Sequence, residues 1–138
     1  MKYLISIIVL TYLAIAFSLK CDSYYQYQVG GFQAQSLDHI ISGCDACGYL
    51  YSNITDFNNF RGFFSGCLFT AKTLAKKYDG KVFNMTEFST TCDKNNKDGI
   101  PYCQQIISTD DGHTMFDSKI CCCSTDTCTR PYFQKTKQ

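Results

Sequence analysis

The chain has 138 residues, and its thirteen basic and twelve acidic side chains give a formal net charge of +1 at pH 7. Neither the acidic nor the basic residues form a long run, apart from a weakly basic C-terminal stretch. A role in binding nucleic acid or anionic membranes therefore has little support. The length fits a single domain once an N-terminal leader is removed.

Residues 1–18 have the pattern of a secretory signal peptide. A charged N-terminus precedes an almost uncharged run that extends to Leu19, and Ala16 and Ser18 place small residues at the third and first positions before a cut. Cleavage after Ser18 leaves a mature chain that begins at Leu19. The alternative is a signal anchor that stays in the membrane, but the apolar run is shorter than the roughly 20 residues of a spanning helix.

All ten cysteines follow this leader, in a compartment that oxidises thiols. They are Cys21, Cys44, Cys47, Cys67, Cys92, Cys103, Cys121, Cys122, Cys123 and Cys128. An even number in a small secreted chain predicts five disulfides and no free thiol. Each bond typically adds about 2–4 kcal/mol to a domain that is stable by about 5–15 kcal/mol, so reduction is expected to unfold the protein.

Three hairpins are predicted along the mature chain. Residues 24–35 are rich in aromatic and alternating residues around Gly30-Gly31, a hairpin turn signal. In residues 48–66 aromatic residues alternate with polar ones, which predicts a second hairpin. The pairing register of its two strands stays open. The third covers residues 102–120, where two strand-like segments flank the strong turn signal Asp110-Asp111-Gly112.

A short amphipathic helix is predicted between the second and third hairpins. Apolar residues recur at three- and four-residue steps from Leu68 to Tyr78, and Gly80 can end the segment. Its lysines form either a partner-binding face or, more commonly, a solvated helix face. We expect a polar loop over residues 94–99 and a polar tail over residues 130–138, which has no hydrophobic anchor for lipid attachment.

The C-terminal cysteine cluster is the most specific pattern in the sequence. Residues 121–128 read Cys-Cys-Cys-Ser-Thr-Asp-Thr-Cys. This segment resembles the closing signature of the three-finger superfamily, which includes lymphocyte-antigen-six and urokinase-receptor domains, snake neurotoxins and activin-type receptor ectodomains. Thr129 stands where the relatives have Asn, so the core-locking hydrogen bonds of that Asn cannot be carried over. The triple cysteine, with Gly66-Cys67 at the fourth cysteine, is most similar to activin type II receptor ectodomains and nematode ET modules.

The resemblance implies a small disulfide-rich β fold over residues 19–129, a three-finger fold in which hairpins radiate from a cysteine knot. The interval from Cys67 to Cys92 is longer than in the receptors and holds the predicted helix. Adjacent cysteines seldom bond each other, so the triplet needs three separate partners. The receptor pairing, carried over, gives Cys21–Cys47, Cys44–Cys67, Cys92–Cys122, Cys103–Cys121 and Cys123–Cys128. Which of Cys121 and Cys122 serves Cys92 is the most open part of this pairing.

Other chemistry finds little support in the sequence. Cys44-Asp45-Ala46-Cys47 matches the redox motif of thioredoxin-like enzymes, but no βαβ pattern surrounds it and the other cysteines indicate a structural framework. His39 and His113 lie in apparent turns far apart in sequence, which disfavours a zinc site. No nucleophile, base and orienting group form a recognisable catalytic set. We therefore expect no enzyme activity, metal or cofactor.

Two segments carry acceptor sequons for N-linked glycans. Asn53-Ile54-Thr55 and Asn84-Met85-Thr86 both follow the leader, and neither contains a proline that blocks transfer. The expected compartment and the loop-like settings agree with glycosylation at Asn53 and Asn84.

The resemblance implies a secreted module that binds a protein partner, either a receptor or an extracellular ligand, with no membrane anchor and no nucleic acid involved. Candidate contact residues are Asp110, Asp111 and His113 at the third hairpin tip, with Leu68 and Ile120 on the sheet face. For each of them the alternative is ordinary turn chemistry or core packing. Disulfide-ordered loops favour such a role, because less ordering is left to oppose binding.

The ligand class is not specified by the residues. In activin type II receptors, aromatic residues form the ligand patch at the positions that match Gly48, Leu68 and Ile120, and none of these three is aromatic here. The alternative function, suggested by the likeness of residues 122–126 to the neurotoxin ending, is a toxin-like or defence effector acting on a membrane receptor or ion channel. A mature charge near zero argues against direct disruption of membranes.

Overall fold

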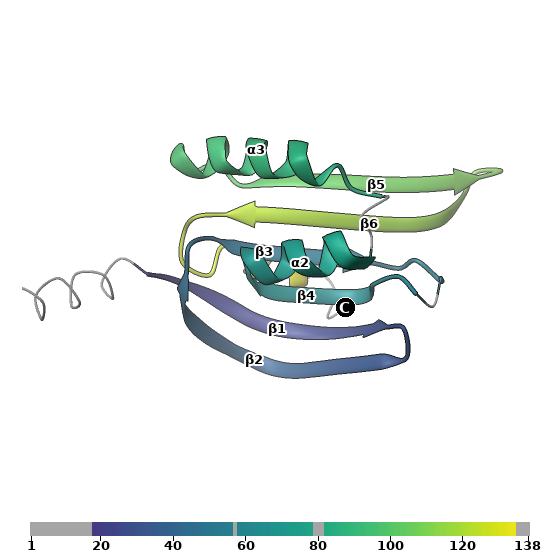
Figure 1. Cartoon of the computed structure of the whole chain (residues 1–138), viewed down its shortest axis with the longest axis horizontal. Coiled ribbons are helices and arrows are strands. Elements are labelled where there is room, and N and C mark those ends of the chain that lie inside the picture. Colours follow the sequence, from purple (N-terminus) through teal and green to yellow (C-terminus); the bar gives the residue numbers. More distant parts are fainter. Residues whose placement is uncertain (1–17, 57, 79–81, 135–138) are drawn as a thin grey trace, which may run out of the picture.

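The protein is a small, disulfide-rich and mostly β structure built on one antiparallel sheet (Figure 1). The structure, a computed structural model, describes residues 18–56, 58–78 and 82–134, so the predicted leader lies outside the described residues except for Ser18. The strands are β1 (Leu19–Val29), β2 (Phe32–Cys44), β3 (Cys47–Ser52), β4 (Arg61–Cys67), β5 (Tyr102–Asp110) and β6 (His113–Cys123). The helices are α2 (Leu68–Tyr78), α3 (Met85–Lys97) and α4 (Arg130–Gln134).

The three predicted hairpins are confirmed, and they lie side by side in the strand order β2-β1-β4-β3-β6-β5. The turn of the first hairpin is Gly30-Gly31, with φ of +49° and +84°. In the third hairpin Asp111 and Gly112 adopt φ of +46° and +78°. Positive φ at both central residues matches the twist of two-residue hairpin turns, which is why Asp-Gly and Gly-Gly favour them.

The first hairpin extends well beyond the predicted segment, because β2 continues to Cys44. His39 therefore lies in a strand and not in a turn. It is exposed, and it follows a bulge at which Leu37 and Asp38 of β2 both lie opposite Tyr24 of β1. The prediction of a turn failed because β2 is largely exposed and lacks the apolar alternation of a half-buried strand.

Two helices occupy the interval between the second and third hairpins, where the sequence predicted one. α2 is confirmed, but the polar loop expected over residues 94–99 is wrong, since α3 continues to Lys97. Asn84 is the N-cap of α3, and its side-chain Oδ1 accepts a hydrogen bond from the Glu87 amide at 3.1 Å. Only Phe88 and Cys92 of α3 are buried, so this polar helix has a weak apolar pattern and depends on capping and packing.

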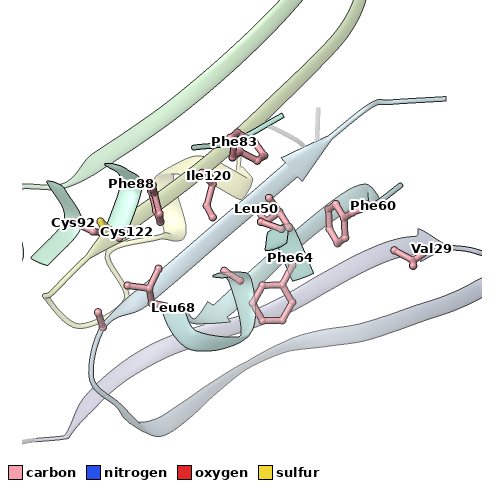
Figure 2. Packing of buried hydrophobic residues seen from close by; sticks show 13 residues of the cluster. Val29, Leu50, Phe60, Phe64, Leu68, Phe83, Phe88, Cys92, Ile120 and Cys122 are labelled. Atoms are coloured by element: carbon pink, nitrogen blue, oxygen red, sulfur yellow. A yellow bond between two sulfur atoms is a disulfide. The ribbon is translucent and has the colours of Figure 1, made fainter. Parts of the chain in front are cut away.

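The main core lies between the sheet and the pair α2 and α3, on the face called here the helix face (Figure 2). Leu50 and Ile120 from adjacent strands are fully buried there beside Phe60, Phe64 and Phe88. α2 approaches closely because it presents small side chains, Ala71 and Ala75, to the sheet. The opposite face, called the open face, carries a smaller cluster around Tyr49, Cys121 and Phe133.

Close approach of α2 also depends on Gly48 in β3. A Cβ atom at this position would lie 2.7 Å from the Leu68 Cα and 2.8 Å from the Ala71 Cβ. These separations are shorter than carbon atoms tolerate, so any larger residue forces the helix away from the strand.

Five disulfides join the described cysteines. They are Cys21–Cys47, Cys44–Cys67, Cys92–Cys122, Cys103–Cys121 and Cys123–Cys128, which are the same pairs that the family resemblance implies. Four of them lie at the end of the sheet where strands start or finish, opposite the hairpin turns, and the bond of Cys92 fastens α3 to β6. Within the described part of the chain no cysteine is free.

The segment after the last disulfide is partly folded, whereas the sequence predicted a polar tail from residue 130. Arg130–Gln134 forms α4, and its Phe133 is buried on the open face between Tyr24 and Tyr49. Arg130 donates a hydrogen bond to the buried carboxylate of Asp22, and this bond raises the pKa of Arg130. The ion pair and the buried ring hold α4 against the sheet.

Thr129, which replaces the Asn of the resembled families, is fully buried and makes its own hydrogen bonds. The Ser65 hydroxyl donates to the Asp22 carbonyl at 2.9 Å, and the Thr129 hydroxyl lies 2.8 Å from the Ser65 oxygen. Because Ser65 has one hydroxyl proton, Thr129 is the donor in the second bond. The chain of two hydroxyls fastens the C-terminal segment to β1 and β4.

Candidate binding surfaces

The tip of the third hairpin projects from the sheet and is exposed. Asp110, Asp111 and His113 all lie there with exposed side chains, so the structure brings together the three tip residues singled out in the sequence. The tip therefore carries two exposed carboxylates and one exposed imidazole, and these side chains contribute little to the core.

The other two candidate contact residues, Leu68 and Ile120, are buried. Ile120 of β6 is 0% exposed beneath the helices, and Leu68, the first residue of α2, is 9% exposed and packs in the same core on the helix face (Figure 2). Core packing, the alternative given for them above, is the role that their burial fits. Gly48, the third position of the receptor-type patch, lies directly under α2. The chain's own helices therefore fill the place where that patch would meet a ligand.

The open face presents a row of polar and aromatic side chains across all six strands. Six residues pair in register with one another across the sheet, and their side chains form a row from β2 to β5. They are Gln35, Gln26, Phe63, Tyr51, Lys119 and Gln105. Their exposure ranges from half-buried for the rings and Lys119 to exposed for the three glutamines. A hollow of about 750 Å³ over the first two hairpins is lined by Tyr51, Phe63, Arg61 and four glutamines.

This row was not found from the sequence, because its members come from six separate strands. The alternation of Gln26 and Gln28 with Tyr25 and Tyr27 is the local signal, since alternate residues of a strand face opposite sides of a sheet. Only the strand order brings these glutamines beside Phe63.

The residues considered for redox or metal chemistry are kept apart. Cys44 and Cys47 belong to different disulfides, with Cys67 and Cys21 respectively, so they do not form a redox pair with each other. His39 and His113 lie on β2 and β6, which three strands separate, at a spacing of at least about 19 Å. Among the described residues no group of three metal-ligating side chains gathers.

Both sequon asparagines are exposed, and both use their side-chain carbonyl in a backbone hydrogen bond. The Asn53 side-chain Oδ1 accepts a hydrogen bond from the Asp117 backbone amide, and the Asn53 backbone amide donates to the Asp117 carbonyl at 3.0 Å. Asn84 accepts from Glu87 at the start of α3. In each case the acceptor bond uses Oδ1, whereas a glycan is attached to Nδ2.

No described helix is both long and apolar enough to span a membrane. A search for similarity found no matching family model, no matching curated protein and no matching solved structure. The five disulfides and the antiparallel sheet fit a small extracellular protein.

Proposed function

We propose that this protein is a secreted three-finger binding module that recognises a protein partner, a receptor or an extracellular ligand. The observation that carries the proposal is the arrangement of three antiparallel hairpins side by side, cross-linked at one end and free at the tips (Figure 1). Covalent bonds order the base, so the exposed tips are held in place before a partner arrives. Less conformational entropy is then lost on binding.

The proposed contact surface is the third tip together with the open face. Tyrosine and arginine are enriched in protein interfaces, and the open face offers Tyr51 and Arg61 beside Phe63. The helix face is not available for contact, because α2 and α3 cover it. A growth-factor ligand bound in the manner of activin type II receptors is therefore not part of this proposal.

The first experiment identifies the partner and then removes the tip. The refolded, glycosylated protein is used to capture extracellular proteins of its own source, and the affinity of each captured partner is measured for a variant with Asp110→Asn, Asp111→Asn and His113→Gln. Asparagine tolerates the left-handed backbone at position 111. We expect binding to weaken about tenfold or more, with little change in thermal stability.

A matched control removes two exposed acidic charges far from this tip, through Asp38→Asn and Asp45→Asn. Unchanged affinity in the control and weaker binding in the tip variant support the proposal. If neither the tip variant nor Tyr51→Ala with Arg61→Ala alters affinity for any captured partner, the proposed surface is wrong. Hydrolytic or redox turnover by the pure protein would instead indicate an enzyme.

A further inference from the structure

The two predicted glycan sites differ in what surrounds them. Two residues before Asn84 the chain has Val82, an aliphatic side chain that packs against the core of the helix face, and α3 begins directly after Asn84. Two residues before Asn53 the chain has Tyr51, whose ring is half-buried on the open face. Of the two sequons, that of Asn53 is therefore the one with an aromatic ring two residues upstream.

The ladder between β3 and β6 places Asn53 on the same face as this ring. The Asn53 backbone amide donates to the Asp117 carbonyl at 3.0 Å, so strand pairing continues one residue beyond the end of β3. Because alternate residues of a strand face the same side, Asn53 follows Tyr51 on the open face, about 7 Å farther along the strand. The Asn53 Oδ1 accepts from the Asp117 amide, which orients the side-chain amide whose Nδ2 carries a glycan.

A second hollow on the open face lies next to Asn53. Its volume of about 380 Å³ is in the range of small-ligand sites, and its wall includes Tyr51 and Asp117, the two neighbours of Asn53. The other lining residues are Tyr49, Gln105, Lys119, Pro131 and Tyr132. Aromatic ring faces attract the C–H groups of a sugar, while ammonium and amide groups hydrogen-bond its hydroxyls. The hollow is therefore chemically suited to a carbohydrate.

We propose that an N-glycan on Asn53 folds back into this hollow, with its first N-acetylglucosamine packed on the Tyr51 ring. The attachment point identifies the occupant, because a sugar joined to Asn53 stays at high local concentration beside Tyr51 and loses little further entropy on contact. The contact needs no partner protein, so this inference goes beyond the proposed function and can fail independently of it. Arg61 and the larger hollow lie on the β4 side of Tyr51, away from β6.

Thermal unfolding of the full chain, secreted from a eukaryotic host that adds N-glycans, tests the proposal. Thr55→Ala destroys the sequon but keeps Asn53 and its bonds to Asp117, and we expect the unfolding midpoint to fall by several degrees. The matched control, Thr86→Ala, removes the Asn84 sequon by the same change at another exposed threonine and should shift the midpoint little. Equal shifts, or a mass spectrum that shows no sugar on Asn53, would overturn the proposal.

A cycle of variants tests the contact with the ring. Tyr51→Leu keeps an apolar side chain without the ring, and it should lower the midpoint more in the wild type than in Thr55→Ala. In Thr86→Ala its effect should equal that in the wild type. NMR gives a direct readout, since the Tyr51 ring should shift the protons of the first sugar on Asn53 and Tyr51→Leu should abolish that shift. Strict additivity of Tyr51→Leu with Thr55→Ala, or sugar protons that Tyr51→Leu does not move, would overturn the proposed contact.

Discussion

The two faces of the sheet use similar residue types for different purposes. The helix face packs Leu50, Ile120 and four buried phenylalanines in the core that the sheet forms with α2 and α3. The open face carries tyrosines and a phenylalanine that stay half-exposed, with α4 covering one end only. Aromatic content in the sequence therefore does not distinguish the buried core from the half-exposed open face. The strand order and the helices that follow β4 make that distinction.

The largest expected difference between the faces is in stability. Leu50→Ala removes a fully buried side chain from the helix face and should lower the free energy of unfolding by about 2–5 kcal/mol. Its chain neighbour Tyr51 is half-buried on the open face, and Tyr51→Ala should cost about half as much or less. Urea unfolding of both variants measures this. Equal losses would mean that the open face is as much a core as the helix face.

The contact between α2 and the helix face is tested by adding atoms to it. Gly48→Val places branched carbons where the Leu68 and Ala71 atoms already lie, and it should destabilise the protein by about 1–3 kcal/mol. Gln33→Val gives a control, since it puts the same branched side chain at an exposed position of β2. The midpoint of thermal unfolding compares them. A Gly48→Val protein as stable as the wild type would mean that α2 does not pack closely on β3.

The attachment of α4 to the open face depends on the Ser65 and Thr129 hydroxyls. Ser65→Ala leaves the buried Thr129 hydroxyl without its acceptor, and the expected loss is about 1–3 kcal/mol. Thr129→Val removes that donor as well, so the double variant should be less destabilised than the sum of the two single variants. Denaturant unfolding of the four proteins measures the coupling. Strict additivity would indicate that the two hydroxyls do not interact.

The smallest expected effect is a pH dependence on the open face. Burial raises the pKa of Tyr132 above its usual value of 10.0, because desolvation disfavours the phenolate. The folded state then holds the phenolic proton more tightly than the unfolded chain. The contribution of Tyr132 is therefore complete below about pH 10 and is lost as the pH rises through the folded pKa. Tyr132→Phe should reduce the fall in stability between about pH 8 and pH 11, and an unchanged fall would exclude Tyr132 as its cause.

Local signals in the sequence predict the hairpins and α2. Gly30-Gly31 and Asp111-Gly112 fix turn geometry by themselves, and the periodic residues of α2 report the face it buries. α3 escaped prediction because its buried surface is only Phe88 and Cys92. The N-cap at Asn84, followed by Glu87, was a visible signal for its start.

The candidate site could be predicted only in part. The third tip is local, so its residues were identified from the turn alone. Burial of Leu68 and Ile120 could not be derived, because it depends on which face α2 and α3 cover. The row on the open face depends on the non-local order of six strands, and no short segment of sequence encodes that order.

The disulfide pairing has a consequence for the response of the protein to a protease. Cys21, Cys44, Cys47 and Cys67 bond only among themselves, and so do the cysteines from Cys92 onward. A single cut at any hairpin tip leaves fragments joined by a disulfide. A single cut between Cys67 and Cys92 leaves no covalent connection, and the halves are then held by noncovalent contacts, among them the β3–β6 ladder, the Arg130–Asp22 ion pair and the Thr129–Ser65 hydrogen bond. The interval between Cys67 and Cys92, which holds α2 and α3, is therefore the one stretch in which a single cut leaves two cross-linked pieces with no covalent bond between them.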